Sequence, residues 1–551
     1  MQTIYIDAQI LQTRAFDRGM GKYSMSILRA LSENKDFIDQ YDPVLVLNKN
    51  LPSDPKRLYD IQITASANRV LVLDMPTDIG QNVEQKYDSA VKILTEVVEK
   101  DLASSQKASY LILAPFFVDF PAVFPNLQQV KKYSIVYDLI PYLIQQKIKI
   151  FPEDVYLRHY QLFLEADHIF SISHAVKDDL VNIIGIRPDK ISNINGGPFA
   201  VSSSLAKQKI VKGPYILYPS APIVHKNNKI AVRGFDIFNK QMAGKYSLLL
   251  TSTFDENTMS ELSDITDKIV FTGNVSDEEM QQLYIGCDAV LFASLIEGLG
   301  MPILEGVSYN KPVACSNISV FTEMSDKAFY IFKPKDATDI AKSLMEATSH
   351  ANWKQKQKHY PQILKKYQWS NSALSIIEGM NRATNIEVHQ PKQKMLVVAP
   401  RPNIANPASR FIEEFYSELS NNYEVRLNYY ASSGTPLMSY VNTVGEVSSA
   451  NFDPAVVLYL DNSYKKRRVR GRRQDQLIYL EITSKKQSII RKLINTKQEA
   501  KHVIKIAAKQ VYLNKNLDLS GWKYTLGDKE LLPTDLIDKI KSAKTNVAST
   551  K

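Results

Sequence analysis

The first 200 residues alternate short, β-branched apolar runs with segments that have the spacing of amphipathic helices. Residues 22–32 have helical spacing, and strand-like runs occupy residues 4–8, 43–47, 69–73, 110–114, 133–137 and 168–172. Strands that are separated by helices in this way favour a parallel, doubly wound sheet. The pattern therefore predicts a Rossmann-like α/β domain over residues 1–200.

The same alternation of strand-like and helix-like segments begins again after a segment rich in Gly, Pro, Ser and Lys, which has the composition of an interdomain linker. Its strand-like runs occupy residues 215–219, 247–250, 268–271, 289–292, 312–315 and 328–331, and helical patterns continue to residue 380. A second Rossmann-like domain is predicted over residues 201–385. The cleft between the two domains should lie beside the linker.

A third series of apolar runs predicts a smaller C-terminal α/β domain over residues 392–551. Strand-like runs begin at residues 395, 425 and 456, a helix is predicted over residues 408–419, and residues 465–473 read KKRRVRGRR. Residues 488–513 have the pattern of a basic amphipathic helix, which suits an anionic membrane surface. A solvated helix packed on its own domain is an equally good interpretation.

Composition narrows the class of protein. The 551 residues include 44% apolar and 23% charged residues, which is typical of a folded chain with several cores. Only Cys287 and Cys315 are cysteines, which favours a reducing cytoplasm over a disulfide framework. The first residues predict a strand and not an export signal, and residues 110–124 are too short to span a bilayer. The net charge of +10 favours phosphate-bearing partners without selecting one.

The segment FASLIEGLGMPILEG contains the strongest chemical signal. A strand ends at Ala293, a Gly-rich turn follows, and a helix begins near Met301. Such a junction places backbone N–H groups and a helix dipole at the carboxyl edge of the sheet, where phosphates bind. Glu297 and Glu305 can face the same crevice and accept hydrogen bonds from vicinal hydroxyls of a sugar or ribose. For an isolated pair, a helix cap at Glu297 and a solvated Glu305 would be the alternative.

Residues 271–324 resemble the retaining glycosyltransferases of family 4, also called glycosyltransferase group 1, in which two glutamates flank an EGFGLP-type turn. The resemblance implies a GT-B fold, in which two Rossmann-like domains face each other, with the first domain on the acceptor side and the second on the donor side. It also implies that Glu297 contacts the donor sugar and Glu305 the ribose hydroxyls. The backbone near the sugar and diphosphate would be that of Gly298, Leu299, Gly300 and Met301.

The first domain carries two further segments of this resemblance. DRGMGKYS, at residues 17–24, is similar to the RGIGRYS-type loop of the mannosyltransferase-like branch, and its Gly19 and Gly21 are candidates for close approach to the donor. VYDLIPYL is similar to the family's VHDLIPL segment, which makes Asp138 a candidate catalytic residue. Tyr137 stands where many members have His, and both residues could instead only shape the turn.

YILYPSAPIVHKNNKIAVRGF resembles the segment that supplies an Arg and a Lys to the donor diphosphate in this family. Cations there stabilise the charge that builds on the leaving group. Lys226 keeps its place, whereas His225 stands at the Arg position and Ser220 at a Gly position. A titratable ring thus replaces a permanently charged group, which alters the phosphate side of the candidate site. In the alternative interpretation, His225 and Lys226 only face solvent.

The resemblance implies transfer of a mannose- or rhamnose-like hexose, with retained configuration, from a nucleotide-diphosphate sugar. The acceptor would be a glycan or lipid-linked molecule in bacterial surface polysaccharide or glycoconjugate synthesis, and no metal or other cofactor is expected. The alternative is a catalytically weakened GT-B scaffold or partner-binding protein within a glycosylation complex, which the changes at Tyr137, Ser220, Ala221 and His225 favour.

Residues 392–551 are expected to form a basic accessory domain, with an incomplete glycosyltransferase-like half as one interpretation. The expected location is cytoplasmic, with peripheral attachment to the inner face of the plasma membrane through this basic region. No nucleic-acid partner is expected, because the region lacks a recognisable nucleic-acid-binding signature.

Overall fold

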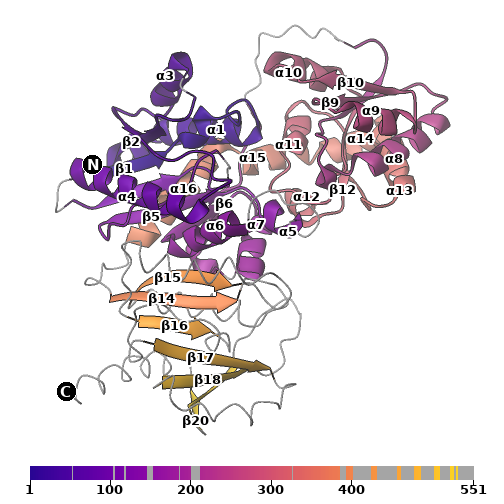
Figure 1. The fold of residues 1–551 in the computed structure, drawn as a ribbon. Coiled ribbons are helices and arrows are strands. Elements are labelled where there is room, and N and C mark those ends of the chain that lie inside the picture. The colour runs from indigo at the N-terminus through magenta and orange to yellow at the C-terminus, as the bar shows by residue number, and fades with distance from the viewer. Residues whose placement is uncertain are drawn as a thin grey trace, which may run out of the picture.

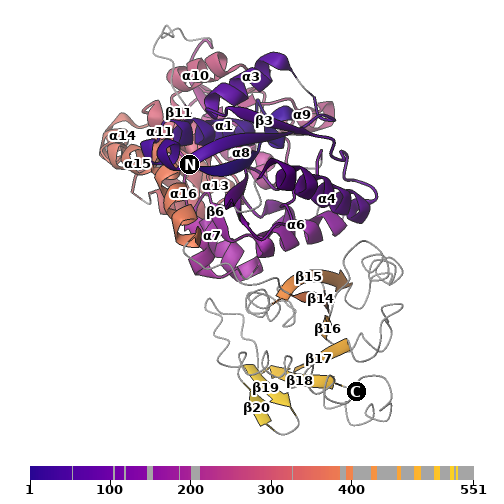
Figure 2. The same cartoon turned by 90° about the vertical axis from the view of Figure 1, so that its left-hand side faces the viewer.

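A computed structural model of the chain describes residues 1–384 except 53, 103–105, 117–118, 145–152, 185, 200–210 and 326, and seven strands beyond them. Two α/β lobes lie side by side, and a third sheet lies below the first of them (Figure 1). The view turned by 90° also separates the third sheet from the two lobes (Figure 2).

The first lobe is built on a parallel seven-stranded sheet with the order β3-β2-β1-β4-β5-β6-β7. Its strands are β1 Gln2–Asp7, β2 Tyr41–Asn48, β3 Arg69–Leu73, β4 Ala108–Ile112, β5 Val130–Val136, β6 His168–Ser171 and β7 Ile191–Asn193. Its helices are α1 Gly19–Ser32, α2 Lys35–Gln40, α3 Pro55–Thr64, α4 Val83–Asp101, α5 Ile140–Ile144, α6 Glu153–Glu165 and α7 His174–Asp179. The central strand β1 pairs with β2 and β4, so its residues from Ile4 to Ile6 are fully buried.

The second lobe has a parallel six-stranded sheet with the order β10-β9-β8-β11-β12-β13. Its strands are β8 Tyr215–Tyr218, β9 Ser247–Thr251, β10 Ile269–Gly273, β11 Ala289–Phe292, β12 Val313–Ser316 and β13 Tyr330–Phe332. Its helices are α8 Asn228–Gln241, α9 Glu256–Ser263, α10 Asp277–Gly286, α11 Met301–Ser308, α12 Ser319–Met324, α13 Ala337–Ala347, α14 His350–Gln357 and α15 Tyr360–Lys366. In both sheets the strands are added first on one side of the central strand, which is β1 or β8, and then on its other side. Ligands of such sheets bind at the carboxyl edge where this order changes.

The two predicted doubly wound sheets are confirmed, because a strand is found at each of the predicted apolar runs in residues 1–384. Successive side chains of β8 belong to two different apolar cores, with Leu217 in one core and Ile216 in the other. The core that contains Leu217 continues into the first lobe. The two sheets are therefore joined by buried apolar contacts as well as by the linker.

The helix α16, Trp369–Thr384, returns from the second lobe to the first. Met380 accepts a hydrogen bond through its carbonyl oxygen from the Tyr133 hydroxyl at 3.3 Å, and the Trp369 indole N–H donates to the Pro198 carbonyl at 2.9 Å. A methyl group on Gly379 would lie 2.6 Å from the Phe170 ring, so this helix packs closely on β6. The C-terminal part of the segment predicted for the second domain thus covers the first sheet.

The third sheet has the order β15-β14-β16-β17-β18-β19-β20, with antiparallel pairing only at β18-β19 and β19-β20. Its strands are β14 Gln393–Pro400, β15 Tyr423–Tyr430, β16 Val456–Leu460, β17 Leu477–Ser484, β18 His502–Ala508, β19 Trp522–Leu526 and β20 Lys529–Leu531. The three predicted strands are found. The order of the first five differs from that of the first lobe, since the third strand in sequence and not the fourth lies next to the first.

One prediction for this region is wrong. Residues 502–508, which we placed within a basic helix over 488–513, form β18 and pair in parallel with β17. The segment HVIKIAA is rich in β-branched residues, which favour a strand when a neighbouring strand is available. The predicted helix at 408–419 and the basic run at 465–473 lie outside the described residues. Among the described residues, no helix combines the length and apolar character that crossing a bilayer requires.

Candidate functional site

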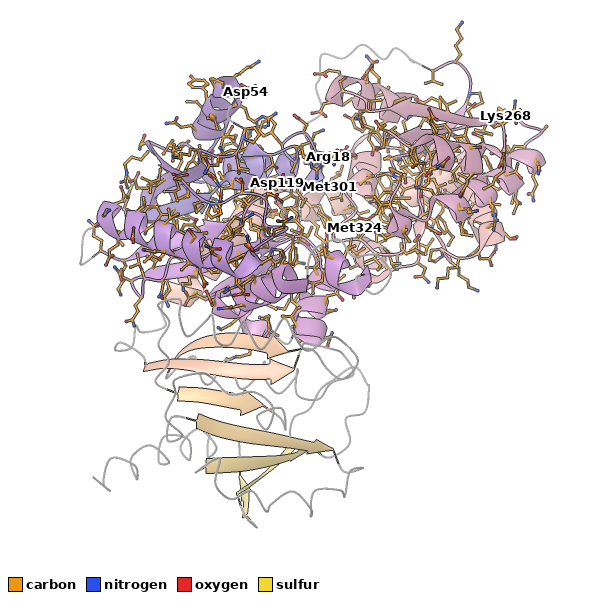
Figure 3. All side chains as sticks on the ribbon, in the orientation of Figure 1. Arg18, Asp54, Asp119, Lys268, Met301 and Met324 are labelled. Atoms are coloured by element: carbon orange, nitrogen blue, oxygen red, sulfur yellow. The ribbon has the colours of Figure 1, made fainter. Side chains whose placement is uncertain are left out.

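The candidate site lies where the carboxyl edge of the second sheet faces the first lobe. The strand β11 ends at Phe292, and the following turn leads into α11 at Met301. Figure 3 labels Met301 and Arg18, which precedes α1, in the region between the two lobes, and Lys22 of α1 forms an ion pair with Asp277 of the second lobe. The two loops that the sequence singled out therefore come from opposite lobes and approach the same space.

Glycine sets the shape of the turn before α11. Gly300 has φ of +90°, a left-handed conformation that L side chains rarely adopt, and a methyl group there would lie 2.6 Å from the Phe321 ring. The Leu299 side chain is 3% exposed and belongs to the core. Of the donor-binding residues predicted here, Leu299 can thus offer a ligand only its backbone, whereas Met301 is half-buried at the first position of the helix.

Glu297 and Lys226, 71 residues apart in sequence, form an ion pair at 2.5 Å. Their side chains are 11% and 19% exposed, so the pair is largely shielded but still reaches solvent. The Lys226 ammonium also lies 5.1 Å from the centre of the Phe292 ring, at the end of β11. An anionic and a cationic group are therefore held next to each other at the edge of the sheet, the arrangement needed to bind hydroxyls and phosphate together.

Backbone hydrogen bonds fix the turn that carries Lys226. The His225 carbonyl accepts from the Leu295 N–H at 2.7 Å, which joins this turn to the segment that holds Glu297. The Asn227 side chain donates to the Ala293 carbonyl at 3.1 Å and to the Pro334 carbonyl at 2.6 Å. Asn227 itself has φ of +61° and directly precedes α8. The cation is thus presented by a turn that is fastened to the end of β11.

The first lobe touches this site through the turn after β5. A methyl group built on Gly298 would lie 2.0 Å from the Tyr137 carbonyl oxygen and 3.2 Å from the Asp138 Cβ. Only a glycine leaves room for this approach between the lobes. Asp138 is thereby brought next to the turn that carries Glu297.

The electrostatics of Asp138 reflect this position. Burial raises the pKa of its carboxyl to about 6, and the negative charge of Glu297 also raises it. The hydrogen bond that the carboxyl accepts from the Ile140 N–H at 2.9 Å and the charge of Lys226 lower the pKa. A carboxyl with a pKa near neutrality can exchange a proton at physiological pH, as a general acid or base must. Tyr137, in contrast, bonds the Ser24 hydroxyl at 2.8 Å and is buried, so its side chain is part of the packing of the first lobe.

Glu305 lies on α11 and is bonded from a neighbouring helix. The Tyr284 hydroxyl of α10 donates to Glu305 Oε2 at 2.6 Å. Burial raises the pKa of Glu305 to about 7, while the hydrogen bond from Tyr284 and the charge of Lys22 lower it and the charge of Asp277 raises it. The alternative of a solvated Glu305 does not apply, since this side chain is half-buried and hydrogen-bonded.

The loop at the start of α1 approaches the same helices. Lys22 forms an ion pair with Asp277 at the beginning of α10, and this pair joins the two lobes. Gly19 is exposed, and a methyl group there would meet nothing within 4 Å. A methyl group on Gly21 would lie 2.2 Å from the Ala15 carbonyl. Gly19 therefore remains a candidate for ligand approach, whereas Gly21 is required by the packing of α1 on its own loop.

His225 and Ser220 differ in how they are engaged. The Ser220 hydroxyl donates to the Asn228 side chain and is 5% exposed, so it stabilises the turn after β8. The His225 ring is half-buried, and its Nδ1 is buried without a hydrogen-bond partner among the described residues. Burial and the Lys226 charge lower the pKa of His225, and Glu297 opposes them. A neutral ring with a free nitrogen can still donate or accept one hydrogen bond.

A further contact between the lobes lies at Glu323 on α12. Its carboxylate accepts from the His174 N–H at 3.0 Å and the Ala175 N–H at 2.8 Å, and so caps α7 of the first lobe. Acceptors at a helix N-terminus satisfy N–H groups that have no partner within the helix. Together with the Lys22–Asp277 pair, this cap holds the lobes in one relative orientation.

The structure thus brings together the predicted residues Glu297, Lys226 and Asp138, with Gly298 at their centre. It places Ser220, Gly21 and the Leu299 side chain in structural roles. Sequence reasoning missed the Tyr284 hydrogen bond and the Lys22–Asp277 pair. Tyr284 belongs to no Gly-rich turn or charged motif, and Asp277 stands in the acidic run at 277–279, where nothing in the sequence indicates its pairing with Lys22.

Comparison with known proteins places this geometry in context. Residues 204–362 match the family described as "Glycosyl transferases group 1". The chain is 23% identical over 411 residues to the serotype-specific mannosyltransferase WbdA of Escherichia coli, covering 69% of this chain and 48% of WbdA. It is 29% identical over 174 residues to the O-antigen chain mannosyltransferase RfbU of Salmonella typhimurium, covering 31% of this chain and 47% of RfbU. The chain spans about half the length of these curated relatives.

A solved structure matches over the first two lobes. The crystal structure of a glycosyltransferase from Rickettsia africae superposes with a TM-score of 0.51 and 15% sequence identity, covering 70% of this chain and 99% of that chain. At this identity the likeness concerns the fold alone. It supports the arrangement of two facing Rossmann-like lobes described above.

Proposed function

We propose that the protein is a retaining glycosyltransferase, because residues 204–362 match the family "Glycosyl transferases group 1" and the two lobes have the arrangement of a GT-B fold. It moves a mannose- or rhamnose-like hexose from a nucleotide-diphosphate sugar to a glycan or lipid-linked acceptor. The observation that carries the proposal is the Glu297–Lys226 pair, which faces Asp138 of the other lobe across Gly298. No metal or other cofactor is part of the proposal.

The charges of the pair suit the two ends of such a donor. Lys226 can turn from Glu297 to the diphosphate and stabilise the charge that develops as the bond to the anomeric carbon breaks. Glu297 then accepts hydrogen bonds from the sugar hydroxyls and orients the ring. The acceptor oxygen bonds to the anomeric carbon on the face that the diphosphate leaves, and its proton passes to the departing phosphate oxygen.

The choice of sugar and pathway rests on the relatives. WbdA and RfbU are named mannosyltransferases, and RfbU is named for the O-antigen chain. These names support a mannose-like donor and an acceptor that belongs to a growing bacterial surface polysaccharide.

A panel of nucleotide sugars tests this proposal. We expect GDP-mannose, or failing that dTDP-rhamnose, to raise the melting temperature and to be consumed when a polysaccharide acceptor is present. A ligand at a hundred times its Kd stabilises the folded state by about 2.7 kcal/mol. The free sugars and nucleoside monophosphates serve as controls, because they lack the diphosphate that Lys226 is proposed to bind. If no nucleotide-diphosphate sugar binds, the proposed activity is wrong.

A non-catalytic scaffold is the second candidate function, and the changed phosphate side favours it. His225 replaces a permanent cation, and its pKa is lowered, so the site has less positive charge than the family pattern implies. A scaffold of this kind would bind the nucleotide without consuming the donor. The same panel distinguishes the two functions, since binding and turnover are measured separately.

We further propose that the protein attaches peripherally to the cytoplasmic face of the membrane. The basic run at 465–473, which lies outside the described residues, contains seven Lys and Arg. Each such residue near an anionic surface contributes about 1 kcal/mol. We expect the full chain to float with vesicles that contain phosphatidylglycerol, and to be released by high salt, which screens these charges. Phosphatidylcholine vesicles are the control, and recovery of unbound protein in both cases would refute attachment.

A further inference from the structure

We infer that Tyr284 is a positioning residue for nucleotide recognition: its hydroxyl orients the Glu305 carboxylate to receive the ribose diol of a nucleoside diphosphate. This inference rests on the proposed function, since it concerns how that same site holds its donor. Tyr284 is 1% exposed, so its side chain has almost no surface to offer a ligand directly. It would act through Glu305.

The geometry of the hydrogen bond supports this role. The Tyr284 hydroxyl lies 2.6 Å from Glu305 Oε2 and 3.4 Å from the Pro302 carbonyl oxygen. Its ring stacks on Tyr309 with centres 5.3 Å apart and planes within 4°. A phenol held in this way fixes one carboxylate oxygen and leaves Oε1 to accept from a ribose hydroxyl. Without this phenol, the Glu305 side chain would lose its conformational freedom only when the ligand binds, and this loss of entropy would weaken binding.

The helix α10 that carries Tyr284 is itself fixed at both ends. At its start, Ser276 and Glu279 form reciprocal hydrogen bonds between side chain and backbone. Near its end, the Tyr215 hydroxyl donates to the Leu283 carbonyl at 2.8 Å. A methyl group on Gly286 would lie 2.4 Å from the same hydroxyl, so the helix rests directly on β8. The donor of the hydrogen bond to Glu305 therefore has a defined position.

The hydrogen bond also affects the charge state of the carboxylate. Glu305 faces Tyr284 and Asp277 on α10, Tyr309 directly after its own helix, and Lys22 on α1. Lys22 and Asp277 are paired with each other and oppose each other in their effect. Burial raises the pKa to about 7, and the bond from Tyr284 lowers it by favouring the ionised form. Removing the hydroxyl should therefore raise this pKa further.

The expected effect on binding has a definite sign. The ionised carboxylate can accept two hydrogen bonds from a diol, whereas the protonated form has lost acceptor capacity. Affinity should thus be highest above the pKa of Glu305 and fall as the pH drops through it. In Tyr284→Phe the fall should begin at a higher pH, and Kd at pH 7 should rise by about tenfold, the scale of one hydrogen bond to a charged group.

Calorimetric titration of the full chain with GDP, UDP and dTDP between pH 6 and 9 tests the inference. Tyr330→Phe is the matched control, because it removes a buried phenol hydroxyl that has no hydrogen-bond partner among the described residues. Tyr330→Phe should leave both Kd and its pH profile unchanged. An unshifted profile in folded Tyr284→Phe would overturn the inference.

Glu305→Gln provides a second variant, which tests whether Tyr284 acts through Glu305. It removes the titrating carboxyl, so adding Tyr284→Phe to this variant should shift the pH profile of Kd no further. If Tyr284→Phe shifts the profile equally with and without Glu305, the hydroxyl does not act through Glu305 and the role of Tyr284 is refuted. If the wild-type chain binds none of the three nucleotides, the proposed function itself fails, which is a separate outcome.

Discussion

Replacing Glu297 with alanine should lower the transfer rate by about 10²-fold or more, the scale expected when one preorganised polar contact to the reacting group is lost. Among the residues that the structure describes, this carboxylate is the ion-pair partner of the Lys226 side chain. Removing it leaves the cation free to bind phosphate but leaves the sugar unoriented. We therefore expect nucleotide binding to persist while kcat falls, as measured by release of the nucleoside diphosphate in the presence of acceptor.

The control for this variant is Glu278→Ala. Glu278 is exposed on α10 and has no part in the site, so its loss should leave the rate unchanged. Glu297→Gln separates charge from shape, because the amide can still accept one hydrogen bond from the sugar. A wild-type rate in Glu297→Ala would rule out the assignment of this residue to the donor sugar.

Gly298→Ala should have the second largest effect, with an expected loss of about 10²-fold in rate, because small misplacements at a reacting centre are costly. The added methyl group would lie 2.0 Å from the Tyr137 carbonyl oxygen, on the backbone of the other lobe. Neither backbone segment can yield by rotating a side chain, so the lobes must separate there. Steady-state rates at saturating donor measure the effect.

Gly80→Ala is the matched control for that variant. Its methyl group would lie 3.4 Å from an Asp78 carboxylate oxygen, an ordinary contact, and Gly80 lies outside the candidate site. The Gly298→Ala variant should largely retain nucleotide binding, measured as a thermal shift, because Lys226 and Glu305 are unchanged. Full activity in this variant would mean that the close approach of the two lobes is not needed for transfer.

The fold of the first two lobes was predictable because parallel strands are buried on both faces and appear as short apolar runs. The strand β7, with three residues, gave no such run and was missed. The position of α16 was not predictable either, because periodicity indicates which face of a helix is buried but not what covers it. In the third sheet, the sequence of β18 predicts part of a helix, because basic residues interrupt its short apolar pattern.

The candidate site was predictable only as far as the family resemblance extends. Glu297 and Lys226 were chosen from separate motifs, and the structure pairs them. The glycine requirement at Gly298 follows from a contact with Tyr137 that depends on how the two lobes face each other. The bond from Tyr284 to Glu305 likewise joins two helices whose packing a single sequence does not specify.

The return of the chain to the first lobe has a consequence for biosynthesis. The sheet that spans Tyr215 to Phe332 is continuous in sequence, so it can be completed as soon as it has left the ribosome. The first sheet must wait longer, because the face that receives Gly379 and Met380 stays uncovered until α16 has been translated. A nascent chain therefore carries an unfinished first lobe while the second lobe folds, and the domain that begins the sequence is completed after the one that follows it.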